Sequence, residues 1–124
     1  MEEGGLLPED VDYINAHGTS TSLGDKAETE AIKFAFGKRA YEIPISSVKS
    51  MTGHMLTASG AFESAVTLMS IYEGVIPTTI NLKTKDPECD LNYITETRKA
   101  EIETAISNSF GFGGVNAVLV FRRV

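Results

Sequence analysis

Apolar and polar residues alternate along this chain with two different spacings, one typical of strands and one typical of helices. Val11–Asn15 and Ile43–Val48 are short apolar-rich runs next to turn residues, a pattern that predicts β-strands. Between them, apolar residues recur every three or four positions after Ser22, which predicts a helix ending at Gly37. We expect the inward face of this helix to consist of Leu23, Ala27, Ala31, Phe34 and Ala35.

The second half of the chain repeats this alternation and then ends in two strands. His54–Glu73 is apolar on nearly every side and is followed by Gly74, which predicts a helix covered on several sides. Residues 75–101 are polar and rich in turn residues, so we expect an irregular connection. Glu103–Ser109 and Val115–Phe121 flank a glycine-rich loop and are predicted to form a hairpin. This order predicts an α/β fold with a mixed sheet of about four to five strands and helices packed on it, one helix being largely buried.

The composition is that of an ordinary globular domain and excludes several classes of function. The chain has 124 residues, 42% of them hydrophobic and 23% charged, which suits one compact domain. Its formal net charge of −6 and the lack of a basic run argue against a nucleic acid or a membrane as partner. The N-terminus has no signal-peptide pattern, and a single cysteine cannot form an internal disulfide, so we expect a cytoplasmic location.

Two histidines each lie near glycine and small polar residues after a predicted strand. His17 precedes Gly18 and three hydroxyl residues, and His54 follows Lys49–Gly53 at the start of the second predicted helix, where a neutral ring is favoured. Two neutral imidazoles directed at one point could donate hydrogen bonds to a developing oxyanion. The alternative for His17 is a loop residue that caps the next helix. We expect no metal, since no carboxylate or cysteine stands at ligand spacing.

Three other features could carry chemistry, each with a simpler structural alternative. Glu63 projects from the apolar second helix, and because a buried carboxylate needs a partner, we hypothesise an ion pair with Lys49 rather than a solvated lysine. Cys89 lies next to carboxylates that oppose thiolate formation, so we interpret it as structural. The loop Gly111–Gly114 lacks a phosphate-binding pattern, and its Phe112 is either a ring on a mobile hinge or a packed turn residue.

Three motifs in this order resemble those of the β-ketoacyl-acyl-carrier-protein synthases, the condensing enzymes of fatty acid synthesis, especially the synthase II group. The motifs are Asn15–Thr21, Ser46–His54 and Asn108–Ala117, and the resemblance covers essentially the whole chain. It implies the thiolase-like fold, in which two similar α/β halves pack together. Residues 1–124 would form a single domain, the C-terminal half of that fold, and no cofactor would be needed.

The resemblance also implies catalytic roles for the matching residues. His17 and His54 would bind the malonyl thioester carbonyl, promote decarboxylation and stabilise the enolate. Lys49 would be the lysine of the second motif and Glu63 its ion-pair partner. Asp25 matches an acidic position that would help to order this network.

Further matching residues would contact the substrate. Thr19 and Thr21 would form hydrogen bonds with the pantetheine arm. Phe112 would be the ring that gates entry of the acyl chain, with Phe110 beside it in the pocket wall. The same loop would contribute Gly111 and Gly113.

The resemblance finally implies what the chain lacks and which partners it needs. In the family the nucleophilic cysteine lies in the N-terminal half, so we expect this chain to be a fragment that is inactive alone. Expected partners are acyl carrier protein with acyl or malonyl pantetheine, the N-terminal half, and a second subunit in the homodimer of the full-length enzyme. The alternative is a non-catalytic module that binds carrier protein or complements a separate N-terminal half. A histidine-dependent hydrolase is disfavoured because the chain has no Gly-x-Ser-x-Gly motif.

Overall fold

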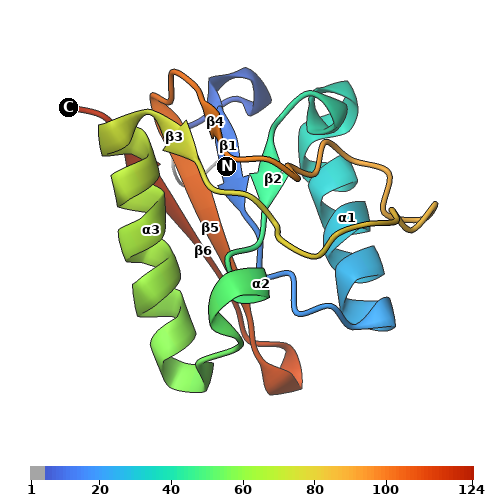
Figure 1. Cartoon of the computed structure of the whole chain (residues 1–124). Coiled ribbons are helices and arrows are strands. Elements are labelled where there is room, and N and C mark those ends of the chain that lie inside the picture. The colour runs from blue at the N-terminus through green and yellow to red at the C-terminus, as the bar shows by residue number, and fades with distance from the viewer. Residues whose placement is uncertain (1–4) are drawn as a thin grey trace.

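One mixed sheet separates two long helices in the computed structural model, which describes residues 5–124 (Figure 1). The four strands of this sheet have the order β2-β1-β5-β6, and β1 is parallel to both of its neighbours, whereas β6 is antiparallel to β5. A second, antiparallel pair joins β3 to β4. The strands are β1 (Tyr13–Asn15), β2 (Ile45–Ser46), β3 (Val75–Ile76), β4 (Arg98–Lys99), β5 (Thr104–Phe110) and β6 (Asn116–Arg122). The predicted α/β class, mixed sheet and terminal hairpin are confirmed.

The two long helices end where the sequence predicts, but the second begins later than predicted, and a short helix between them was not predicted. The helices are α1 (Ser22–Phe36), α2 (Lys49–Thr52) and α3 (Ser59–Glu73). Gly37 and Gly74 follow α1 and α3, and both glycines have positive φ. The prediction that the second long helix starts at His54 is wrong, because Gly53 with φ +72° ends α2 and a short 3-10 turn then precedes α3.

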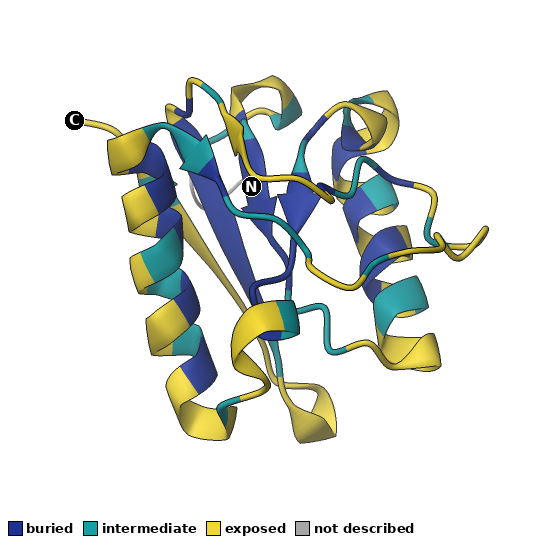
Figure 2. Cartoon of the chain, viewed as in Figure 1, coloured by how far each residue is buried: buried dark blue, intermediate teal, exposed yellow. Residues whose placement is uncertain are grey.

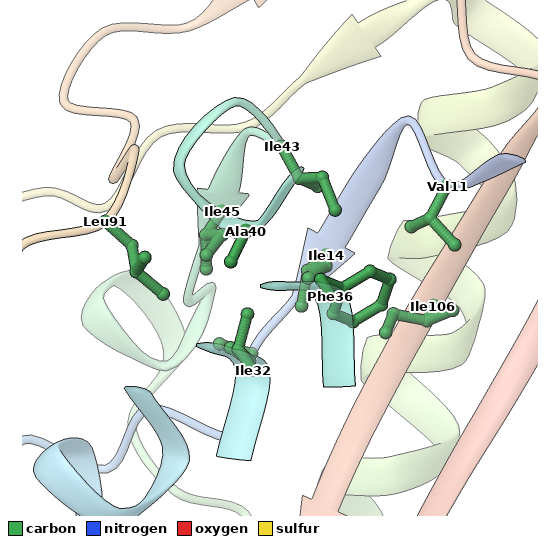
Figure 3. Close-up of a cluster of buried hydrophobic side chains, with 10 residues drawn as sticks. Val11, Ile14, Ile32, Phe36, Ala40, Ile43, Ile45, Leu91 and Ile106 are labelled. Carbon is green, nitrogen blue, oxygen red and sulfur yellow. The ribbon is translucent and has the colours of Figure 1, made fainter. Parts of the chain in front are cut away.

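The core has two parts because successive strand residues point to opposite faces of the sheet. Ile14 of β1 faces α1 and packs with Ile32 and Phe36 (Figure 3). Its neighbour Tyr13 faces the other layer and packs with Ile71 of α3. Both helices are thereby fixed to the sheet, one on each side.

The face of α1 that meets the sheet differs from the predicted one. Leu23 is 82% exposed and Phe34 is 95% exposed, so the predicted apolar stripe points away from the sheet. The residues that are buried instead are Glu28, Thr29, Ile32 and Phe36. Because α1 carries apolar residues on more than one face, their spacing alone does not decide which face packs inward.

The prediction that α3 is largely buried is wrong for the described chain. Only one side of α3 meets the sheet, and four of its five buried residues are polar: Ser59, Glu63, Thr67 and Ser70, with Ile71 as the fifth. Figure 2 shows exposed positions along the outer side of α3. The large apolar residues exposed on this helix are Phe62, Leu68, Met69 and Tyr72. The apolar residues on all sides of α3 predicted burial, but residues 5–124 provide cover on one side only.

Three loops meet at one edge of the sheet because the strands that precede them are parallel. The His17 loop follows β1, α2 follows β2, and the glycine-rich loop follows β5. Figure 1 shows α2 and the β5–β6 turn at the same end of the molecule. No helix among residues 5–124 has the length and apolar character needed to cross a membrane.

Candidate functional site

His17 and His54, 37 residues apart in the sequence, face each other at this edge of the sheet. Their ring centroids are 5.6 Å apart and the ring planes are nearly perpendicular, at 87°. Phe110 packs against His17 at a centroid distance of 5.6 Å. Both histidines line a cleft of about 1040 Å³, together with Thr19, Thr21, Phe110, Gly111 and Phe112. The structure therefore brings most of the predicted site residues to one cleft.

The ring of His17 is held in its neutral form. Burial, the positive charge of Lys49 and the neighbouring His54 lower the pKa of His17 from 6.5 to about 4. Its Nδ1 atom is buried and has no hydrogen-bond partner within residues 5–124. The other ring nitrogen, Nε2, is therefore the atom that can meet a ligand in the cleft.

The protonation of the His54 ring follows from its neighbours. The backbone N–H of Leu56 donates to Nδ1 at 3.1 Å, so Nδ1 must present a lone pair. A neutral ring then carries its proton on Nε2. The arrangement can thus supply a neutral N–H donor to an oxygen that gains negative charge.

The hypothesised ion pair between Lys49 and Glu63 is present. Lys49, the first residue of α2, is 7% exposed, and Glu63 in the middle of α3 is 2% exposed. A buried ion pair adds little net stability but fixes the groups that form it, because breaking it leaves a bare charge. The pair ties α2 to α3 and places one positive charge near His17.

Glu28 is a buried carboxylate at the site that the sequence analysis did not single out. It accepts the backbone N–H groups of His17 at 2.9 Å and Gly18 at 2.8 Å, and the side-chain amide of Asn108 at 3.0 Å. Burial raises the pKa of Glu28, and these three donors oppose that shift. The sequence spacing could have indicated that Glu28 is buried, because it lies four and eight residues before the buried Ile32 and Phe36, on the same face of α1.

Gly18 is required where the His17 loop crosses the loop before α2. Its φ is +39°, and a Cβ atom at this position would lie 2.6 Å from Cβ of Ser47. The hydroxyl of Ser47 donates to the carbonyl of Gly18 at 2.9 Å. This close approach sets the distance between the two histidine-bearing segments.

The hydroxyl residues after His17 are held by Asp25. Oδ1 of Asp25 accepts the N–H of Ser20 at 3.1 Å, where Ser20 has a left-handed backbone with φ +63°. Burial raises the pKa of Asp25. The hydroxyls of Thr19 and Thr21 are 3.3 Å apart and both line the cleft. Asp25 thus orders the cleft wall, with hydrogen bonds to this loop and none to the Lys49–Glu63 pair.

The glycine-rich loop places its two phenylalanines differently. Phe110 ends β5 half-buried beside His17, whereas the Phe112 ring is fully exposed at the tip of the turn. Gly113 and Gly114 have φ of +80° and +81°, which only glycine adopts without strain. Within residues 5–124, Phe112 is not a packed turn residue. The half-buried Cys89 lies in the wall of a second cleft of about 700 Å³, which His54 also lines but His17 does not.

A protein-family comparison identifies most of this chain. Residues 1–83 match the family described as Beta-ketoacyl synthase, C-terminal domain. A protein of Synechocystis sp. named 3-oxoacyl-[acyl-carrier-protein] synthase 2 is 53% identical over 124 residues. A protein of the same name from Coxiella burnetii is 51% identical over 125 residues. These alignments cover 99% and 100% of this chain but 30% of each relative.

Solved structures of the same kind share the fold. A ketosynthase of a type II polyketide synthase, in complex with its acyl-carrier protein, matches 99% of this chain with a TM-score of 0.96 and 44% identity. A β-ketoacyl synthase from Burkholderia phymatum matches 99% of it with a TM-score of 0.92 and 44% identity. The chain corresponds to 30% of each of those chains. The predicted fold, the C-terminal half of the thiolase-like architecture, is confirmed.

Proposed function

Because the chain belongs to the β-ketoacyl synthase family, as its C-terminal domain, we propose that it supplies part of the active site of a 3-oxoacyl-[acyl-carrier-protein] synthase. The reaction is a decarboxylative Claisen condensation of an acyl thioester with malonyl-acyl carrier protein during fatty acid elongation. The observation that supports this most directly is the pair of facing histidines, His17 and His54, beside a buried positive charge.

The histidines act as neutral hydrogen-bond donors in this mechanism. When the malonyl carboxylate leaves as carbon dioxide, its bonding electron pair remains on the α-carbon and is delocalised onto the thioester oxygen. Nε2–H groups of His17 and His54 stabilise that enolate oxygen. A ring with a pKa of about 4, such as His17, stays neutral during the reaction and keeps its donor in place.

The carbon–carbon bond forms with a group outside this chain. The enolate carbon attacks the carbonyl of an acyl group held as a thioester on a cysteine of the N-terminal half, and the cysteine sulfur leaves as thiolate. Cys89 is not assigned this role, because it does not line the cleft that His17 and His54 share. Lys49 and Glu63 hold α2 against α3, and the Lys49 charge disfavours protonation of His17.

The remaining cleft residues would bind the carrier-bound substrate. Thr19 and Thr21 line the cleft and form hydrogen bonds with the pantetheine arm, and Asp25 orders their loop. Phe112, exposed on a glycine turn, gates entry of the acyl chain, while Phe110 lies in the pocket wall. Gly111 lines the same cleft, and Gly113, which does not, provides the turn with a positive φ of +80°.

The proposed partners fit the surfaces of the chain. The N-terminal half covers the apolar outer face of α3, which would otherwise stay in water. Acyl carrier protein delivers acyl and malonyl groups, and the similar polyketide synthase ketosynthase is itself in complex with an acyl-carrier protein, which supports this partner. The complete enzyme is a homodimer and acts in the cytoplasm, without a cofactor.

Complementation tests this proposal. The chain is mixed with the separately produced N-terminal 70% of the Synechocystis relative, which complements the 30% of that protein that this chain matches. We expect the mixture to condense acyl and malonyl carrier proteins, and neither part to do so alone. Ser70→Ala serves as the control, because Ser70 is a buried serine that donates to a carbonyl of its own helix, far from the cleft chemistry.

Two further variants assign the roles. His17→Asn and His54→Asn should each lower the rate of condensation at least about a hundredfold, as expected for loss of one oxyanion donor. Condensation by the isolated chain, or full activity of both variants, would contradict the proposal. A mixture that binds acyl carrier protein without turnover would favour the non-catalytic module instead.

A further inference from the structure

Ser59 is a buried serine that contacts one of the two histidines directly. It is the first residue of α3, is 4% exposed, and has no role in the mechanism described above. Its hydroxyl oxygen lies 2.9 Å from Nδ1 of His54. The same oxygen accepts the backbone N–H of Met55 at 2.9 Å.

The neighbouring donors determine where the hydroxyl proton of Ser59 goes. Since the N–H of Leu56 donates to Nδ1 of His54 at 3.1 Å, Nδ1 is an acceptor. The Ser59 oxygen uses one lone pair for the N–H of Met55, and its single proton remains available. The only direction consistent with both contacts is from Ser59 to Nδ1, so His54 receives two donors on one nitrogen.

Ser59 also closes a loop that local backbone preference does not favour. Leu56 has φ +52°, a left-handed conformation that costs energy for a residue with a Cβ atom, and its side chain is 72% exposed. Ala58, the residue just before α3, has no side-chain group that could form a capping hydrogen bond with the first turn of the helix. The hydrogen bond from Met55 to Ser59 therefore ties the strained turn back to the start of α3.

We propose that Ser59 is a positioning residue for His54. Together with the amide of Leu56, its hydroxyl fixes the ring plane and keeps the ring proton on Nε2, the atom that the condensation needs as a donor. The use of that donor rests on the proposed function. The tautomer, the ring contact and the closed loop are properties of the folded chain and can be measured without activity.

Nuclear magnetic resonance of the ¹⁵N-labelled chain tests the proposal, because only two histidines contribute ring signals. In the wild-type chain at neutral pH, long-range correlations should show His54 with a protonated Nε2 and an Nδ1 shielded by hydrogen bonding. Ser59→Ala should move Nδ1 towards the value of a free ring lone pair. It should also speed hydrogen exchange at the Met55 amide about fivefold, as expected for loss of one hydrogen bond.

Two matched variants separate this effect from general loosening of α3. Ser59→Thr keeps a hydroxyl and should restore both the Nδ1 shift and the protection of Met55. Ser70→Ala removes an equally buried serine hydroxyl from the same helix, where it donates to the carbonyl of Val66, and should change neither signal.

The outcomes are distinct from those of the activity test. A wild-type His54 with its proton on Nδ1 would overturn the proposal, even if Ser59→Ala does not fold. An unchanged Nδ1 shift and Met55 exchange rate in a folded Ser59→Ala chain would overturn it too. An inactive complemented enzyme with the expected His54 spectrum would contradict the proposed function and leave the role of Ser59 standing.

Discussion

The two long helices each bury one carboxylate near the edge of the sheet that carries the two histidines, and the two carboxylates find different kinds of partner. Glu63 of α3 faces the cation of Lys49, whereas Glu28 of α1 has three neutral donors: two backbone N–H groups and the amide of Asn108. One carboxylate is balanced by charge and the other by hydrogen bonds alone. A charge partner can be removed by one substitution, but backbone donors cannot.

This difference gives the two histidines different kinds of support. Glu28 holds the backbone on which His17 sits, so it sets a position. On the α3 side, burial and then the positive charge of Lys49 lower the pKa of His17, and the Lys49–Glu63 pair holds α2, which ends two residues before His54, against α3. The comparison predicts that removing the charge partner on the α3 side lowers folding stability strongly. Disturbing the hydrogen bonds of Glu28 on the α1 side should lower it less.

Removal of Lys49 should have the largest effect on stability. Lys49→Met leaves the Glu63 carboxylate buried without its cation, which is expected to cost about 3–5 kcal/mol of the free energy of unfolding. Urea denaturation measures this loss. The double variant Lys49→Met/Glu63→Leu should recover most of it, because no unpaired charge remains. A single variant as stable as the double variant would show that the pair is not what holds α2 to α3.

Removal of the charge on Glu28 should cost less. Glu28→Gln keeps one acceptor oxygen but turns an amide N–H towards a backbone donor, so we expect a loss of about 1–3 kcal/mol. Glu30→Gln, at an exposed position of the same helix with a surface ion pair to Lys33, is the control and should stay within about 0.5 kcal/mol. Equal losses of unfolding free energy for the two variants would mean that the buried hydrogen bonds of Glu28 do not contribute to stability.

These two carboxylates also show what the sequence could reveal. Glu63 stands out because α3 is otherwise apolar, alanine-rich or hydroxylic, so the pair with Lys49 could be hypothesised and is confirmed. Glu28 shares α1 with other acidic residues, and its burial depends on which face of α1 meets the sheet. That face was predicted wrongly, since Leu23 and Phe34 point outward.

Element types were more predictable than their limits or surroundings. The order of the two long helices and of the four strands in the main sheet follows from local spacing. The short helix α2 and the two-residue strands β3 and β4 were not predicted, the two strands lying at the ends of a stretch predicted to be irregular. The later start of α3 goes with the positive φ of Gly53 and of Leu56, and with the hydrogen bond from the Met55 N–H to Ser59, none of which apolar spacing indicates. The exposure of Tyr72 and Met69 on α3 depends on which neighbours cover this helix, and the apolar pattern of the helix alone does not reveal that. The roles of the site residues remain predictions.

The titration of His17 tests the electrostatic part of the comparison. Burial, the charge of Lys49 and the neighbouring His54 lower the pKa of His17 from 6.5 to about 4. As the pH falls from about 6.5 to about 4, the unfolded chain gains a proton at this ring before the folded chain does, so folding stability decreases over that interval. Above about 6.5 this contribution is fully present, and below about 4 no further loss arises from His17.

Ring proton shifts against pH give the midpoint of His17 directly. In Lys49→Met/Glu63→Leu the midpoint should move upward towards 6.5, because the nearby positive charge is gone. In Glu28→Gln it should stay near 4, since Glu28 does not contribute to that shift. A midpoint near 6.5 in the unaltered chain would contradict the burial of this ring.

The outer faces of the two helices should matter least for folding and most for association. Phe34→Gln on α1 and Leu68→Gln on α3 replace exposed apolar residues with a good helix former, so each should change stability by less than about 0.5 kcal/mol. The outer face of α3 carries four large exposed apolar side chains: Phe62, Leu68, Met69 and Tyr72. A contiguous patch of this kind favours burial against a partner.

Sedimentation velocity at increasing concentration separates the two faces. We expect the chain to self-associate, Leu68→Gln to weaken that association clearly, and Phe34→Gln to weaken it less. The N-terminal half added in the complementation test should suppress self-association, because it competes for the same face of α3. Self-association that resists both substitutions, or that persists with the N-terminal half bound, would place the contact elsewhere on the chain, for example on the exposed apolar strand β6 with Val118 and Val120.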